Sequence, residues 1–166
     1  MKKTCSVFAT RWGYVAAVWS ESGLWELTFP HPTADEALTS LHHAADAVPG
    51  DSPWAAALGQ ELERYFAGEK LDFTVPIDWS GYTSFQATVL RYNATIAYGA
   101  VASYGQVAAA IGSPKASRAV GEALHINRTP VVVPCHRVVG ADGRMVGFGG
   151  GIPRKEALLQ LEQEGR

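Results

Sequence analysis

The chain has 166 residues, of which 47% are hydrophobic and 18% charged, with a formal net charge of −2 at pH 7. This composition is typical of a globular protein with a substantial core, and no apolar stretch approaches the roughly 20 residues that a transmembrane helix needs. The N-terminus lacks the long apolar segment of a secretory signal, so we expect a cytoplasmic protein whose two cysteines are reduced thiols.

Charge is divided unevenly between the two halves of the chain. Residues 1–80 carry 5 Lys or Arg and 11 Asp or Glu, whereas residues 81–166 carry 9 and 5. A basic half indicates a polyanionic partner. Small domains often differ by this much, however, so the indication needs a motif to support it.

The first 80 residues predict an α/β domain. Three segments rich in Val, Phe, Trp and Thr and separated by short turns predict a β-meander over residues 6–10, 14–19 and 24–29. Thr33 and Glu36 fit a capping box that starts a helix running to about Val48, and a second helix follows from Pro53 to Gly68. We expect a short strand over Leu71–Val75.

Residues 76–82 form the predicted linker, so the expected domains are 1–80 and 81–166. The second domain is predicted to be mostly helical, with a helix from Thr83 to about Tyr98. A further helix from Ser103 through Ile111 and another from Ser113 to His125, joined at Gly112, fit the helix-turn-helix pattern. Lys115 and Arg118 lie at the start of its second helix, where free backbone N–H groups also attract phosphates.

An unusual stretch follows these helices. The run Val131–Val133 leads through Pro134, which restricts the backbone before it, so we expect an extended strut that presents Cys135 beside His136. After it we expect a small hairpin that pairs Val138–Val139 with residues 144–146, a glycine loop over residues 147–151, and a final helix through Glu164.

Several chemical interpretations compete for these residues. The glycine loop lacks the third glycine and the downstream chain of a dinucleotide site, so no nucleotide cofactor is expected. The His and Cys spacings match no standard zinc pattern. Cys135 is either a buried structural cysteine or a nucleophile with His136 as base and Glu162 as orienting carboxylate, and spacing alone does not show that the three meet.

The stretch Pro134-Cys135-His136-Arg137-Val138 resembles the signature of the O6-alkylguanine-DNA alkyltransferases, or methylated-DNA–protein-cysteine methyltransferases. The resemblance covers most of residues 81–164 and fits the first 80 residues loosely. Its further matches are Phe85-Gln86, Ser103–Ala108, Arg118–Gly121, Asn127, Pro130, Gly147–Gly151 and Arg154–Leu159 with Glu162.

The resemblance implies that an alkyl group passes from O6 of guanine in DNA to Cys135, once per molecule and without a cofactor or metal. His136 would be the base acting through a water, Glu162 its orienter, Asn127 a hinge, and Tyr104 a donor to the base. Residues implied in DNA binding are Arg118, the finger that replaces the flipped nucleotide, with Tyr104, Lys115, Ser103 and Ala119. Residues implied in the alkylguanine pocket are Pro130, Val138, Phe148, Gly149 and Gly150.

The implied partner is double-stranded DNA containing O6-alkylguanine, with O4-alkylthymine as a second candidate lesion, and the implied state is a monomer. Phe148 stands where tyrosine is frequent, so a phenolic contact is lost. Gly149 stands where a small side chain often narrows the pocket, so adducts larger than methyl are expected to fit. Three alternatives stay open: a non-catalytic lesion binder, a helix-turn-helix regulator, and a cysteine hydrolase.

Overall fold

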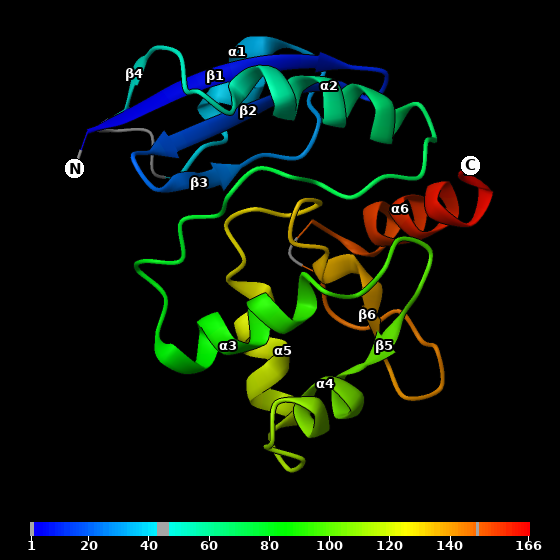
Figure 1. Ribbon diagram of the computed structural model, residues 1–166. Coiled ribbons are helices and arrows are strands. Elements are labelled where there is room, and N and C mark those ends of the chain that lie inside the picture. The colour runs from blue at the N-terminus through cyan, green and yellow to red at the C-terminus, as the bar shows by residue number, and fades with distance from the viewer. Residues whose placement is uncertain (1, 43–46, 149) are drawn as a thin grey trace. The chain divides into compact units, whose positions relative to one another are not determined.

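The computed structural model describes residues 2–42, 47–148 and 150–166 (Figure 1). The chain divides into two compact units, Met1–Trp79 together with Arg166, and Ser80–Gly165. Within the described ranges, no helix has the length and apolar character needed to cross a membrane.

The first unit is a four-stranded sheet with two helices (Figure 1). The strand order is β3-β2-β1-β4, and the first three strands form an antiparallel meander, which confirms the predicted one. The central strand β2 is buried from Val15 to Trp19, because the sheet is covered on both faces there. Its elements are β1 (Lys3–Thr10), β2 (Gly13–Ser20), β3 (Gly23–Leu27), α1 (Ala34–Thr39), β4 (Ala47–Pro49) and α2 (Ala55–Phe66).

Two predictions in this unit are wrong. The helix expected to reach Val48 ends at Thr39, and β4 instead pairs in parallel with Lys3–Cys5, so sheet pairing outweighs the helical pattern; residues 43–46 of that expected helix lie outside the described ranges. No strand forms over Leu71–Val75. The edge of β3 is paired later, where Leu24 forms a bridge with Ile77.

The second unit is mostly helical, with a helix-turn-helix and one small parallel sheet (Figure 1). Helices α3 and α4 both contact α5, and β5 pairs with β6. Capping boxes start α3 at Thr83 and α4 at Ser103, as predicted. Its elements are α3 (Ser84–Asn93), β5 (Ala102–Ser103), α4 (Tyr104–Ala110), α5 (Ser117–His125), the 3-10 turn η1 (Cys135–Arg137), β6 (Val138–Val139) and α6 (Ile152–Glu164).

Element ends differ from the predictions for local reasons. Helix α3 stops at Asn93 rather than Tyr98, where the Thr95 hydroxyl donates to the Tyr92 carbonyl over 2.6 Å and competes with helix continuation. Helix α5 begins at Ser117 because residues 113–116 close a separate turn. The predicted hairpin is also wrong, since β6 pairs with β5.

Candidate active site

Cys135 begins the 3-10 turn η1, so the expected extended strut is wrong. Val131 adopts a φ of 73°, a conformation that β-branched residues rarely adopt. The N–H of Val133 bonds back to the Thr129 carbonyl over 2.9 Å, and the N–H of Cys135 donates to the Val133 carbonyl over 2.8 Å. Successive tight turns, held by backbone hydrogen bonds, therefore fix the position of the sulfur.

Two amide side chains hold this turn from neighbouring helices. Asn127, just after α5, donates from Nδ2 to the Val133 carbonyl (2.9 Å) and accepts at Oδ1 from the Thr129 N–H (3.0 Å). Asn93, at the end of α3, is fully buried and donates to the Pro134 carbonyl over 3.1 Å. The resemblance assigned Asn127 to this place, whereas sequence reasoning missed Asn93.

His136 and Glu162 meet in the interior although 26 positions separate them. Nε2 of His136 lies 2.5 Å from Oε2 of Glu162, and both side chains are buried. Because an ionised carboxylate only accepts hydrogen bonds, Nε2 carries the hydrogen and Nδ1 is the ring nitrogen that can take a proton. The structure thus joins an imidazole in the tautomer of a base to an orienting carboxylate, and Cys135 directly precedes that imidazole in the chain.

Arg137 is a member of this cluster that sequence reasoning missed. Its Nε and Nη2 donate to the two oxygens of Glu162 over 2.8 and 3.0 Å, and its Nη1 donates to the Ile96 carbonyl over 2.7 Å. The guanidinium lies 5.7 Å from the ring centre of Tyr98. An arginine inside a buried apolar stretch requires a carboxylate partner, and that signal was present in the sequence.

Burial and these contacts set the charges of the site. Burial raises the pKa of the Cys135 thiol, against a lowering by a hydrogen bond from Asn127, so the sulfur rests as a neutral thiol at pH 7. Burial also lowers the pKa of His136, which therefore rests as neutral imidazole. Burial alone would raise the pKa of Glu162, but hydrogen bonds from His136 and Arg137 bring it down to about 2. The resting site is a neutral thiol, a neutral base and an anion neutralised by arginine.

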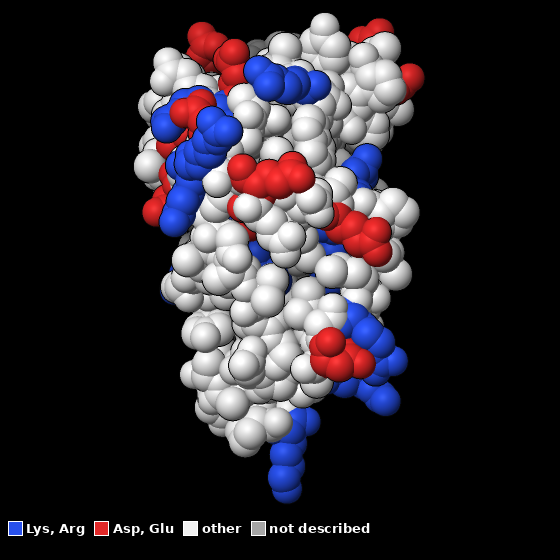
Figure 2. Space-filling view, turned by 90° about the vertical axis from the view of Figure 1, so that its right-hand side faces the viewer, with Lys and Arg blue, Asp and Glu red and all other residues white. Residues whose placement is uncertain are grey.

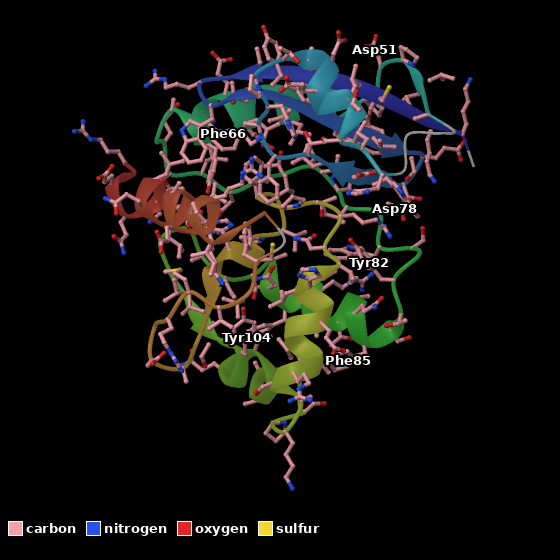
Figure 3. The ribbon with its side chains drawn as sticks, turned by 180° about the vertical axis from the view of Figure 1, so that it is seen from behind. Asp51, Phe66, Asp78, Tyr82, Phe85 and Tyr104 are labelled. Atoms are coloured by element: carbon pink, nitrogen blue, oxygen red, sulfur yellow. The ribbon has the colours of Figure 1, made fainter. Side chains whose placement is uncertain are left out.

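Tyr104, the first residue of α4, lies against the loop that follows β6 (Figure 3). Its hydroxyl donates to the Val146 carbonyl over 3.0 Å, and Nζ of Lys155 donates to the same carbonyl over 3.0 Å. Lys155 is fully buried and lies 5.9 Å from the ring centres of both Tyr104 and Phe148. Sequence reasoning missed Lys155, because a lysine in a helix is ordinarily a solvated residue.

A groove of about 670 Å³ opens between α4, α5 and this loop. Arg118 is exposed on it, one residue after the start of α5, and the Tyr104 ring lies beside Gly121 of that helix. The groove is lined by Tyr104, Ser117, Arg118, Gly121, Glu122, His125, Ile126, Val146 and Gly147.

The other expected residues are distributed around this region. Lys115 is exposed before α5, Ala119 is half-buried within it, and the Ser103 hydroxyl caps α4 by accepting from the Gln106 N–H over 3.0 Å. Of the expected pocket residues, Pro130 and Val138 are buried and Phe148 and Gly150 are half-buried, whereas Gly149 lies outside the described residues. On the face that Figure 2 shows, lysines and arginines stand in separate groups among acids and uncharged residues, without one continuous basic patch.

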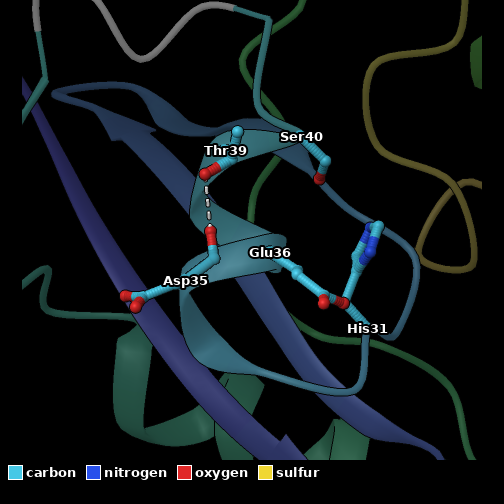
Figure 4. Close-up of a pocket in the computed structure, with 5 residues that line it drawn as sticks. All are labelled: His31, Asp35, Glu36, Thr39 and Ser40. Carbon is cyan, nitrogen blue, oxygen red and sulfur yellow. Dashed lines mark hydrogen bonds between the residues drawn. The ribbon is translucent and has the colours of Figure 1, made fainter.

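A second, open pocket lies in the first unit (Figure 4). It is lined by His31, Asp35, Glu36, Thr39 and Ser40, and the Thr39 hydroxyl donates to the Asp35 carbonyl over 2.7 Å. In the part of the chain that the structure describes, no three His, Cys, Asp or Glu residues are grouped to hold a metal ion.

Comparison with known proteins gives concordant matches. The sequence profile of the family described as 6-O-methylguanine DNA methyltransferase, DNA binding domain, matches residues 84–164. A methylated-DNA–protein-cysteine methyltransferase of Mycobacterium tuberculosis is 49% identical over 116 residues, which cover 70% of this chain and 69% of that protein. The constitutive Bacillus subtilis protein of that name is 43% identical over 114 residues, covering 68% of each chain.

Solved structures agree with these matches over nearly the whole chain. The Mycobacterium tuberculosis OGT in complex with DNA is similar with a TM-score of 0.80 and 38% identity, over 96% of this chain and 92% of that one. An O6-methylguanine-DNA methyltransferase from Pyrococcus kodakaraensis, at 23% identity and a TM-score of 0.63, shares the fold. The similarity thus includes the first unit, which the sequence motifs cover loosely.

Proposed function

The chain belongs to the methylated-DNA–protein-cysteine methyltransferase family, and on this premise we propose that it repairs O6-alkylguanine in double-stranded DNA by transferring the alkyl group to its own Cys135. The observation that carries the residue assignment is the buried contact of 2.5 Å between His136 and Glu162, directly beside that cysteine. Cys135 is the acceptor, His136 the base and Glu162 the group that orients the base.

The transfer balances without a cofactor. The Cys135 proton passes through a water to Nδ1 of His136, and the sulfur attacks the alkyl carbon. The carbon–O6 bond breaks, its electron pair stays on the guanine, and a proton restores the normal base. The thioether on Cys135 has no bond that water or base readily cleaves, so each molecule acts once.

Thiol activation supplies only part of the rate. A thiol at its ordinary pKa is a few per cent thiolate at neutral pH, so full ionisation gains about 30-fold, and nucleophilicity falls as the pKa falls. Positioning of the sulfur in line with the alkyl carbon, and hydrogen bonds to the departing guanine, must supply more. The turn held by Asn127 positions the sulfur. The Tyr104 hydroxyl would release the Val146 carbonyl and donate its hydrogen bond to the departing guanine instead.

A base stacked in a duplex hides its O6 substituent, so the nucleotide must be flipped out at a cost of a few kcal/mol. Arg118, exposed at the start of α5 beside the groove, would fill the vacated stack. Lys115, Ser103, Ala119 and the N–H groups at the start of α5 would contact the backbone. Pro130, Val138, Phe148, Gly149 and Gly150 would surround the flipped base.

The remaining assignments follow from the same premise. Residues 1–80 form an α/β domain and residues 81–166 the DNA-binding and alkyl-acceptor domain. The protein acts as a monomer in the cytoplasm, on O6-alkylguanine and in a second capacity on O4-alkylthymine. No metal or organic cofactor takes part.

Mass spectrometry after incubation with duplex DNA containing O6-methylguanine tests the proposal. One methyl per protein, located on Cys135 and absent from the Cys135→Ser variant, is expected. Binding without methylation would indicate a lesion binder, selective binding of one undamaged sequence would indicate a regulator, and repeated ester or peptide cleavage would indicate a hydrolase. Each of these three results would overturn the proposal, as would several methyls per molecule.

A further inference from the structure

Glu162 receives more hydrogen bonds than orientation of one imidazole requires. Its two oxygens accept from Nε2 of His136, from Nε and Nη2 of Arg137, and from the backbone N–H of Gly99 over 3.2 Å. A carboxylate has about four acceptor positions, so all of them are in use. A proton on Glu162 would break one of these bonds, and the carboxylate therefore stays an anion.

Without a compensating positive charge, the Glu162 carboxylate would prevent His136 from acting as a base. A carboxylate in contact with an imidazole favours the imidazolium, which cannot take a proton from a thiol. Nε and Nη2 of Arg137 donate hydrogen bonds to the two Glu162 oxygens, and the positive guanidinium compensates the negative charge of this carboxylate. The charged groups that act on His136 are Glu162 and Lys155 of α6 and Arg137 of η1.

We propose that Arg137 is a positioning residue for the transfer, which shares Glu162 with His136 so that the carboxylate orients the imidazole without holding it in the protonated state. The proposal rests on the proposed function, in which His136 is the base. Arg137 is itself fixed by the Ile96 carbonyl and packed near the Tyr98 ring, so the compensating charge cannot move away from the pair. The pKa of His136 is lowered first by burial, and the charge of Arg137 lowers it further against the raising effect of Glu162.

The pH dependence of the reaction with free O6-benzylguanine tests the proposal, since this substrate reports on chemistry without DNA binding. The rate of the native protein should fall only below pH 6.5, the ordinary pKa of a histidine. In Arg137→Gln the midpoint of this acid limb should move upward by about one pH unit or more. Arg137→Lys keeps a charge and should stay closer to the native midpoint. Arg64→Gln, an exposed change in the first unit, should not move it.

A uniform loss of rate at every pH, with the same midpoint in Arg137→Gln and the native protein, would overturn the proposal, because a merely structural arginine gives that result. Should Arg137→Gln not fold, NMR titration of the His136 ring in the unreacted native protein decides. A native midpoint below 6.5 that rises in Arg137→Lys, whose ammonium lacks the two parallel N–H groups of the guanidinium, supports the proposal. Equal midpoints in the two proteins, or a native midpoint above 6.5, contradict it. Absence of any benzyl transfer would contradict only the expected fit of adducts larger than methyl, whereas absence of methyl transfer from an O6-methylguanine duplex would contradict the proposed function. The titration would still test Arg137 in either case.

Discussion

The hydroxyl of Tyr104 and the ammonium of Lys155 donate to a single acceptor, the Val146 carbonyl, each over 3.0 Å. This carbonyl belongs to the loop that borders the groove, so one hydroxyl and one buried cation together fix the edge of the site. The Tyr104 hydroxyl is also the proposed donor to the guanine. This hydroxyl is therefore held in place by an acceptor that the base must replace.

Replacement of Tyr104 by Phe should slow alkyl transfer much more than it destabilises the fold. Removal of one donor to a departing group typically costs about 10²-fold in rate, whereas one partly exposed hydrogen bond contributes about 1 kcal/mol to stability. Single-turnover rates with O6-benzylguanine and a thermal melt measure the two effects. A variant with the native rate would remove the hydroxyl from the reaction.

Replacement of Lys155 by Met tests the buried cation. Among the described residues no carboxylate pairs with this lysine, whose ammonium donates to the Val146 carbonyl inside the protein. Burial of a charge without a counter-ion is costly, so Met, of similar shape, should leave the melting temperature unchanged or raise it. The positive charge lowers the pKa of Cys135, so the variant thiol should react several-fold more slowly with iodoacetamide at pH 8. A large fall in melting temperature with unchanged thiol reactivity would contradict this account.

Some of this site could be predicted from the sequence and some could not. Cys135 and His136 are adjacent, and the motif around them is specific enough to indicate the family. The contact of His136 with Glu162 depends on how α6 packs, which spacing does not encode. Asn93, Arg137 and Lys155 were missed for the same reason, since each acts through a partner from a different part of the second unit.

The secondary structure, too, was predictable in some places and not in others. Capping boxes at Thr83 and Ser103 start helices where local hydrogen bonds alone decide. Local patterns failed at positions where a distant segment competes. Helix α1 ends at Thr39 and Ala47–Pro49 form β4 on the edge of β1, and β6 pairs with β5 instead of its sequence neighbour.

Acid should destabilise the protein through Glu162. Its pKa of about 2 in the folded state lies below the ordinary 4.5, so it contributes stability above pH 4.5 that is lost as the pH falls toward 2. At 1.36 kcal/mol per pKa unit, this contribution is about 3 kcal/mol. Urea unfolding between pH 6 and pH 2 should show the loss. The Glu162→Gln variant, less stable at pH 6, should show a flatter profile, and parallel profiles for the two proteins would contradict the assignment.

Replacement of Arg118 should slow the reaction with duplex DNA and leave the reaction with the free base almost unchanged. Flipping a nucleotide costs a few kcal/mol, and a side chain that fills the gap recovers part of it, so Arg118→Ala should slow repair of an O6-methylguanine duplex by about 10- to 100-fold. Reaction with free O6-benzylguanine needs no flipping and should change by less than about 2-fold. Lys115→Ala is the matched comparison, because loss of a phosphate contact should weaken binding to all sequences and reduce the salt dependence by about one unit of slope. Equal losses by Arg118→Ala on both substrates would exclude the flipping role, since a general defect at Cys135 would then explain them.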